Sequence, residues 1–204
     1  MIILPRLYAI LDTSLFPETE NLYGSAKEMV AGGVTLLQYR NKSGNARQML
    51  DQARDLQRLL GDSVKLILND RADLCIAAGF DGVHLGQDDL FPEGARKVIG
   101  EDLWMGVSTH NPQQVEAADQ TSADYIAIGP VFATSSKANP DPVIGLAGIR
   151  EARRLTRKPL VAIGGITRAN CLSVMDAGAD SVAVISDLTR EPRKSVEEFL
   201  HILG

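Results

Sequence analysis

Short apolar runs alternate along this chain with longer segments in which apolar residues recur at helical spacing. The runs are unbroken, which is typical of strands buried on both faces in a parallel sheet covered by helices. The pattern predicts eight such strands, at residues 7–11, 34–39, 64–68, 83–85, 103–107, 125–128, 160–163 and 182–185.

The segments between these runs have the pattern of helices. Residues 45–60 show it clearly, because an apolar stripe runs along one side of an otherwise charged segment and a glycine follows it. We expect helices at residues 21–31, 45–60, 72–78, 92–99, 112–120, 146–156, 167–177 and 192–203.

Eight strand–helix units in 204 residues predict an α/β protein, a single (β/α)8 TIM barrel spanning residues 1–204. A weak repeat supports this prediction, since similar residues mark the approach to every even-numbered strand, at 31–34, 78–81, 123–126 and 177–180. The alternative is a doubly wound open sheet. Its Gly-x-Gly-x-x-Gly fingerprint is absent after the first strand.

Composition narrows the classes of partner. The net charge of −5 lacks the basic excess that nucleic-acid binding requires, so we expect no nucleic-acid partner. No apolar run approaches membrane-spanning length, and the first residues are too short for a signal peptide. Cys75 and Cys171 show neither a disulfide framework nor a zinc spacing. We therefore expect a cytoplasmic protein without a membrane partner, in which Cys75 is a buried, inert thiol.

Acidic side chains follow two consecutive predicted strands. Asn69 and Asp70 come directly after the third strand, and Asp88 and Asp89 follow the fourth. Parallel strands end at the same edge of a sheet, ~4.8 Å apart, so carboxylates from both strands could hold one cation. Two acids that leave coordination positions of the metal open suit Mg²⁺, because this ion also binds substrate phosphates. The alternative is that these acids cap helices and solvate loops.

A polar and basic set follows the second strand. Gln38, Arg40 and Lys42 alternate, so in an extended segment they point the same way. Two cations and an amide suit a diphosphate, because arginine can bind phosphate oxygens in a fork. A solvated strand exit is the alternative. Ser108 follows the fifth strand, and His84, inside the fourth, is expected to be a hydrogen-bonded barrel residue.

The connection after the sixth strand, residues 130–144, is long for a β–α loop, and it carries Thr134, Ser136 and Lys137. Long loops of this kind act as lids or binding loops, although a surface loop is the alternative. Without ligand, we expect residues 133–142 to be mobile.

Glycines and a serine follow the last two strands. Gly164 and Gly165 bring bare backbone amides to the rim, Thr167 is expected to start a helix, and Ser186 follows the eighth strand. In many TIM barrels these loops form a phosphate site. The pocket therefore offers two anion sites, which suit one substrate with a diphosphate and another with a monophosphate.

Nine stretches taken in order resemble the thiamine phosphate synthase family from one end of the chain to the other. They are residues 38–42, 68–71, 81–89, 106–110, 124–126, 129–132, 134–137, 163–166 and 184–186. The resemblance implies a (β/α)8 enzyme that condenses 4-amino-2-methyl-5-(diphosphooxymethyl)pyrimidine with a thiazole phosphate. The products are thiamine phosphate and pyrophosphate, and the reaction depends on Mg²⁺.

The resemblance also implies roles for single residues. The family positions that bind the pyrimidine diphosphate correspond to Gln38, Arg40, Lys42, Asn69, Ser108 and Lys137. Those that bind the thiazole phosphate correspond to Thr134, Ser136, Gly165, Ile185 and Ser186. The positions of the Mg²⁺ ligands correspond to Asp70 and Asp89. Four of them are expected to be catalytic, namely Arg40, Lys42, Ser108 and Lys137. Asp88 does not match a metal ligand.

Two departures from the family pattern fall in the long loop. Ser136 stands where the family usually has Thr, and Ala133 stands where it often has Pro. Two other functions on the same barrel are alternatives, a thiazole tautomerase and a non-catalytic regulator that binds a thiamine precursor. The oligomeric state stays open, with a homo-oligomer as one possibility.

Overall fold

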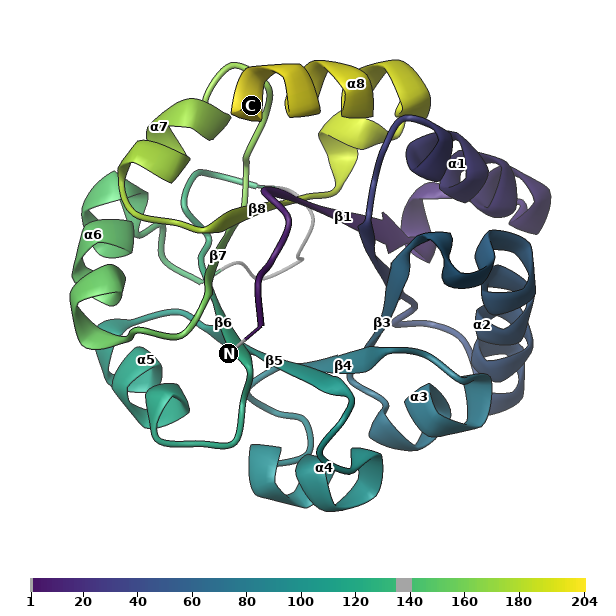
Figure 1. Cartoon of the computed structure of the whole chain (residues 1–204), viewed down its shortest axis with the longest axis horizontal. Coiled ribbons are helices and arrows are strands. Elements are labelled where there is room, and N and C mark those ends of the chain that lie inside the picture. Colours follow the sequence, from purple (N-terminus) through teal and green to yellow (C-terminus); the bar gives the residue numbers. More distant parts are fainter. Residues whose placement is uncertain (1, 135–140) are drawn as a thin grey trace.

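In residues 2–134 and 141–204, which the computed structural model describes, eight parallel strands close into a barrel inside a ring of helices (Figure 1). The strands are β1 (Leu7–Asp12), β2 (Leu36–Arg40), β3 (Lys65–Asn69), β4 (Gly82–Leu85), β5 (Trp104–Thr109), β6 (Tyr125–Ile128), β7 (Leu160–Ile163) and β8 (Ser181–Val184). Because β1 pairs with β8, the sheet is closed. The predicted TIM barrel is confirmed and the open-sheet alternative is wrong.

Helices follow the strands around the ring. They are α1 (Thr19–Ala31), α2 (Ala46–Leu60), α3 (Ala72–Ala78), α4 (Pro92–Ile99), α5 (Pro112–Asp119), α6 (Gly145–Leu155), α7 (Cys171–Asp176) and α8 (Pro192–Leu203), with short 3₁₀ helices η1 (Thr13–Leu15), η2 (Gly61–Ser63) and η3 (Ser186–Leu188). Most predicted bounds hold within one or two residues.

The start of α7 is the largest difference between prediction and structure. We expected a helix from Thr167, but α7 begins at Cys171. The Thr167 amide donates to the side chain of Asn170 (2.8 Å), and the Asn170 amide donates back to the Thr167 carbonyl (3.1 Å). Asparagine side chains favour such local turns over helix interiors, so a turn replaces the expected first helical residues.

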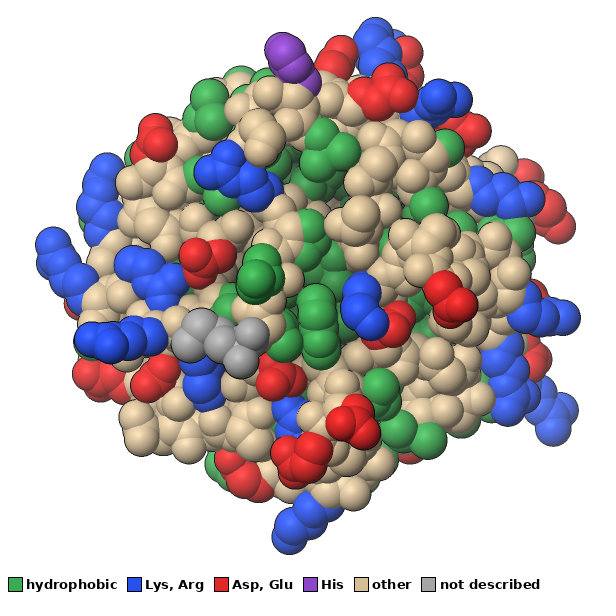
Figure 2. All heavy atoms as spheres, viewed as in Figure 1, with side chains coloured by type: hydrophobic (Ala, Val, Ile, Leu, Met, Phe, Trp, Pro, Cys, Tyr) green, Lys and Arg blue, Asp and Glu red, His purple; other side chains and the backbone are tan. Residues whose placement is uncertain are grey.

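Apolar packing fills the barrel interior from the end at which the strands begin. This interior cluster contains Leu4, Tyr8, Ile10, Leu36, Ile67, Tyr125, Ala127, Val161 and Ala183. The N-terminal segment crosses the middle of the ring, and the same view in spheres shows hydrophobic side chains near the centre with most charged ones toward the rim (Figures 1 and 2). The opposite end, where the strands finish, is left for polar side chains.

The sequence repeat ahead of even-numbered strands has a structural cause in three of its four copies. There an aspartate just before the strand donates its amide to the preceding strand and accepts an amide from the same residue of that strand. The pairs are Asp81 with Leu66, Asp124 with Met105 and Asp180 with Leu160, at N···O distances of 2.7–2.9 Å. Each clamp fixes the register between two strands.

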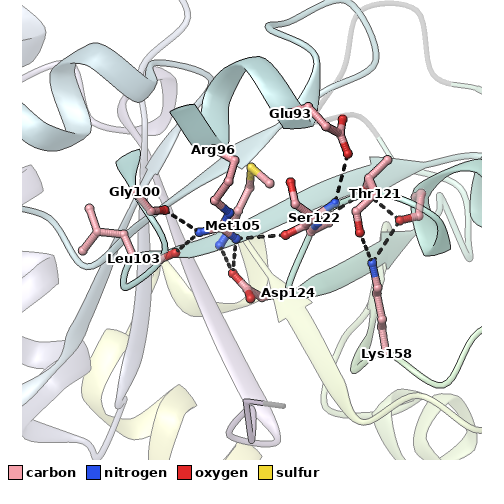
Figure 3. A network of polar contacts seen from close by, with 11 residues as sticks. Glu93, Arg96, Gly100, Leu103, Met105, Thr121, Ser122, Asp124 and Lys158 are labelled. Atoms are coloured by element: carbon pink, nitrogen blue, oxygen red, sulfur yellow. Dashed lines mark hydrogen bonds and ion pairs between the residues drawn. The ribbon is translucent and has the colours of Figure 1, made fainter. Parts of the chain in front are cut away.

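A buried arginine reinforces one of these clamps (Figure 3). Arg96 on α4 is 7% exposed and donates to Asp124 and to the carbonyls of Gly100, Leu103 and Ser122, at 2.7–2.9 Å. These contacts join α4 to the starts of β5 and β6. They lie at the end of the barrel away from the strand C-termini, where TIM barrels place stability rather than chemistry.

Candidate active site

A cavity of about 560 Å³ opens at the end of the barrel where the strands finish. Every sequence-predicted site residue that the structure describes lines it, namely Gln38, Arg40, Lys42, Asn69, Asp70, Asp89, Ser108, Thr134, Gly165, Ile185 and Ser186. Ser136 and Lys137 lie outside the described residues, as does most of the loop expected to be mobile. The cavity therefore brings together residues spread over 149 positions of sequence, from Gln38 to Ser186, counted inclusively.

Two carboxylates meet at one side of the cavity. Burial raises the pKa of Asp70, the contact with Asp89 raises it further, and Lys42 opposes both effects. The Asp70 amide donates to the His84 carbonyl (2.7 Å), which attaches this residue to β4. Asp89 accepts the amide of Gly86 (2.8 Å) and so turns back toward the cavity. These bonds hold the two acids against each other.

The backbone of Asp70 lies in the left-handed region, with φ of 67°. Among the non-glycine residues that the structure describes, it alone has a positive φ. Such a conformation costs free energy in most residues, although aspartate and asparagine tolerate it best. The strain therefore coincides with the predicted metal position. Asp88, which the family pattern leaves out, also borders the cavity but is exposed.

Both predicted diphosphate cations are paired with acids. Lys42 forms an ion pair with Asp70, and Arg40 forms one with Asp12. Asp12 ends β1 beside Arg40 in the sheet register, is 3% exposed, and also accepts the amide and hydroxyl of Ser14. Asp12 was not among the predicted site residues, although its position as an acid at a strand end was a signal that could have found it. Its structural role is to fix the Arg40 guanidinium at the rim.

Asn69 carries a buried polar atom that lacks a hydrogen-bond partner among the described residues, the side-chain nitrogen Nδ2. A buried amide donor without an acceptor costs roughly 1–3 kcal/mol. Because Asn69 borders the cavity, a bound polar ligand can supply the missing acceptor. The unpaired donor thus marks where a substrate atom belongs.

A series of hydrogen bonds runs through the barrel interior beneath the cavity. Gln38 Nε2 donates to the Tyr8 hydroxyl (2.8 Å), and the hydroxyls of Tyr8 and Tyr125 lie 3.0 Å apart. Tyr125 Oη lies 3.1 Å from His84 Nδ1, and His84 Nε2 lies 2.9 Å from Ser108 Oγ. The prediction that His84 is a hydrogen-bonded barrel residue is confirmed. The two tyrosines were missed, because each lies within an apolar run.

The glycines after β7 form a tight turn at the far rim. Gly164 and Gly165 have φ of 103° and 63°, and a Cβ on Gly165 would lie 2.5 Å from the Ala133 carbonyl oxygen. The loop after β6 therefore packs directly on this turn. The predicted helix start at Thr167 is wrong, since α7 starts four residues later, and residues 167–170 form a turn beside these glycines instead.

An arginine absent from our predictions joins the last two loops. The Arg168 backbone amide and side chain donate to both carboxylate oxygens of Asp187 at 3.0–3.1 Å, and its guanidinium also pairs with Glu198. Asp187 directly follows Ser186, so this contact holds the loop after β7 beside the loop after β8. The two sides of the predicted phosphate site are thus fixed relative to each other.

The acids of the site are few. Within the described part of the chain, no group of three or more His, Cys, Asp or Glu side chains is placed to hold a metal ion. Asp70 and Asp89 therefore supply two carboxylates at most, and a cation between them would need further oxygen ligands from substrate or water.

Comparison with known proteins gives a consistent result. The profile of the family described as Thiamine monophosphate synthase matches residues 7–188. A thiamine-phosphate synthase of Koribacter versatilis (strain Ellin345) is 64% identical over 203 residues, covering 98% of this chain and 96% of that protein. One from Chloroflexus aurantiacus (strain ATCC 29366 / DSM 635 / J-10-fl) is 44% identical over 184 residues, covering 89% and 83%.

A solved structure agrees with these relatives. Thiamine phosphate pyrophosphorylase from Pyrococcus furiosus superposes with a TM-score of 0.86 at 35% identity, covering 97% of this chain and 95% of that one. In the described part of the present chain, the helices are all too short or too polar to cross a membrane.

Proposed function

The chain belongs to the thiamine monophosphate synthase family, and we propose how the residues of its cavity divide that reaction between them. The enzyme joins a pyrimidine diphosphate to a thiazole phosphate, giving thiamine phosphate and pyrophosphate in thiamine biosynthesis. The observation that carries the residue assignment is their convergence, since all the described residues that the family pattern selects line one cavity.

Asp70 and Asp89 would hold Mg²⁺ together with the diphosphate of the pyrimidine substrate. The residues present fit this ion, because Mg²⁺ is typically bound by one or two carboxylates, with phosphate oxygens of the substrate and water molecules as its remaining ligands. The pair is also in mutual contact, which raises the Asp70 pKa, and a divalent cation would offset that repulsion. Bound Mg²⁺ would supply positive charge to the departing pyrophosphate.

Cationic side chains supply the rest of the charge at the leaving group. We assign Arg40 and Lys42 to the diphosphate oxygens, with Asn69 donating through its unpaired Nδ2. The bond between the pyrimidine methylene carbon and the diphosphate oxygen breaks, and pyrophosphate departs with the electron pair. Preorganised donors stabilise that charge without reorganising at the moment of reaction. The family resemblance adds Lys137, which lies outside the described residues.

The thiazole phosphate is assigned to the opposite rim. Gly165, Ile185 and Ser186 border the cavity there, and the Arg168–Asp187 contact holds their two loops together. Thr134 lies on the loop that packs over this turn, and the resemblance adds Ser136. With both substrates bound, the thiazole nitrogen attacks the methylene carbon, and holding the reactants together lowers the entropic cost of that step.

Reconstitution tests this assignment. The purified protein is incubated with both substrates across a Mg²⁺ titration, and thiamine phosphate and pyrophosphate are measured. We expect equal amounts of the two products and no product without the thiazole phosphate. Thiazole isomerisation without condensation would support the tautomerase alternative, and binding without turnover would support the regulator.

Cellular location and domain organisation complete the proposal. We place the reaction in the cytoplasm, supported by two cysteines that are buried and free. We also propose that one barrel domain carries the whole reaction, since both rims belong to the same cavity.

A further inference from the structure

Two side chains assigned to the pyrimidine substrate, Gln38 and Ser108, are connected through the barrel interior. The connection runs through the hydroxyls of Tyr8 and Tyr125 and then through the imidazole of His84. Every step is a single hydrogen bond between side chains of different strands. A change at one end can therefore reach the other end without any movement of the backbone.

Tyr125 is the middle group of this chain, and the barrel is shaped around it. Its side chain is fully buried, and it is absent from the described residues that line the cavity. The sheet register places His84, Gly106 and Tyr125 side by side on β4, β5 and β6. A Cβ on Gly106 would lie 2.1 Å from Tyr125 Cζ and 2.5 Å from His84 Nδ1. The missing side chain of Gly106 thus lets the phenol meet the imidazole.

The direction of every hydrogen bond follows from the Gln38 end. The amide nitrogen Nε2 can only donate, so Tyr8 accepts from it. The Tyr8 proton is then donated to the Tyr125 oxygen, because a bond in the opposite direction would leave this buried proton without an acceptor among the described residues. Tyr125 then donates to His84 Nδ1. A neutral imidazole carries one proton, so it stands on Nε2 and is donated to Ser108 Oγ.

The consequence lies at Ser108. Its oxygen already accepts a bond from His84, so its own proton is available to the cavity. If every hydrogen bond of the series pointed in the opposite direction, Ser108 would donate to His84 Nε2 and would present only lone pairs to a ligand. Burial raises the pKa of both phenols well above the ordinary value, so both stay protonated at neutral pH and keep this order.

We propose that Tyr125 is a positioning residue for the pyrimidine substrate. Its hydroxyl fixes His84 as the Nε2-protonated tautomer and thereby makes Ser108 a hydrogen-bond donor toward the substrate. The proposal rests on the assignment of Gln38 and Ser108 to the pyrimidine half of the site. Tyr125 acts only through its neighbours.

The test compares Tyr125→Phe with a matched control. Tyr39→Phe removes a phenol hydroxyl of equal burial that bonds Gln52 and Asn41 behind the barrel wall. The first measurement is the ¹⁵N NMR signature of the His84 tautomer in substrate-free protein, assigned with a His84→Gln variant. The second is the KM for each substrate.

We expect the Nε2-protonated form of His84 in the parent and in Tyr39→Phe, and its loss or mixing with the other tautomer in Tyr125→Phe. The KM for the pyrimidine diphosphate should rise about tenfold in Tyr125→Phe, the effect of one hydrogen bond, with the KM for the thiazole phosphate unchanged. Because the NMR signal needs no substrate, it tests the hydrogen-bond chain even if the assigned reaction fails.

A second variant tests the donor-to-acceptor direction of these hydrogen bonds, and it also tests the proposal if Tyr125→Phe does not fold. Gln38→Glu replaces the donor by a carboxylate, which only accepts, so the chain should reverse and His84 should become protonated at Nδ1. Retention of the Nε2-protonated form in the folded variants would overturn the proposal. Equal KM changes in Tyr125→Phe and Tyr39→Phe would overturn it as well.

Discussion

The contact between Asp70 and Asp89 leads to a prediction in which activity and stability move in opposite directions. Replacing Asp70 by Asn removes one negative charge and keeps a side chain that tolerates the left-handed backbone at φ 67°. Alanine would confuse the two effects, because it would add backbone strain. Asp70→Asn therefore isolates the charge.

The effect on stability follows from the raised pKa of Asp70. The Asp70 carboxyl group therefore binds a proton more tightly in the folded chain than in the unfolded chain, where the pKa of an aspartate is about 3.9. The contribution of Asp70 to stability therefore falls as the pH rises from the unfolded-state pKa through the raised folded-state pKa, and at neutral pH the ionised group disfavours folding. Asp70→Asn also removes the ion pair with Lys42, but this loss offsets little of the gain in stability. The Lys42 side chain is 54% exposed, and such exposed pairs contribute ~0–1 kcal/mol.

We therefore expect Asp70→Asn to melt at the same temperature as the parent or higher at pH 7, while its turnover falls about 10²–10³-fold, the scale for removing one transition-state stabiliser. Asp89→Asn should lose turnover similarly, and exposed Asp88→Asn is the matched control with near-parental turnover. The assay is product formation across a Mg²⁺ titration, with melting curves for all three. Near-parental turnover of Asp70→Asn at every Mg²⁺ concentration would refute the reasoning, as would equal losses in all three variants.

Three further predictions concern a glycine at the cavity, a buried arginine at the opposite end of the barrel and a buried thiol on α3. Gly165→Ala should lower stability by more than 1 kcal/mol and raise the KM for the thiazole phosphate, because the new Cβ would lie 2.5 Å from the Ala133 carbonyl oxygen at a positive φ; unchanged melting would contradict this. Arg96→Met should lower stability by about 3–5 kcal/mol in urea titrations while the folded enzyme keeps its kcat, and a changed kcat would count against a purely structural role. The Cys75 thiol, whose pKa burial raises to about 12, should react with a thiol reagent only on unfolding; rapid labelling of the native protein would disprove this.

Much of the fold could be predicted from local pattern. Unbroken apolar runs separated by helical segments indicate buried parallel strands, and their number and spacing favour a closed barrel over an open sheet. Polar residues at the strand ends could be assigned to one rim for the same reason, because parallel strands all finish at the same end. This reasoning placed Arg40, Asp70, Asp89 and Gly165 around the cavity that the structure contains.

The local sequence pattern gave a wrong helix start where a side-chain hydrogen bond competes with helix formation. The periodic residues near Thr167 predicted a helix, but the Asn170 side chain caps a turn there and delays α7 to Cys171. That competition is decided by a bond between two residues of the loop, which apolar periodicity does not report.

Only the tertiary structure decided which strand residues face the barrel interior. Both faces of a TIM-barrel strand are buried, so Tyr8 and Tyr125 lie in apolar runs without the alternation that distinguishes the two faces of a half-exposed strand. Closure of the barrel sets their side chains against each other across 117 positions of sequence, and the register of β1 with β2 places Asp12 beside Arg40. The local pattern of the chain determined the order of its elements and the chemistry at their ends, whereas contacts across the barrel depend on the register and closure of all eight strands.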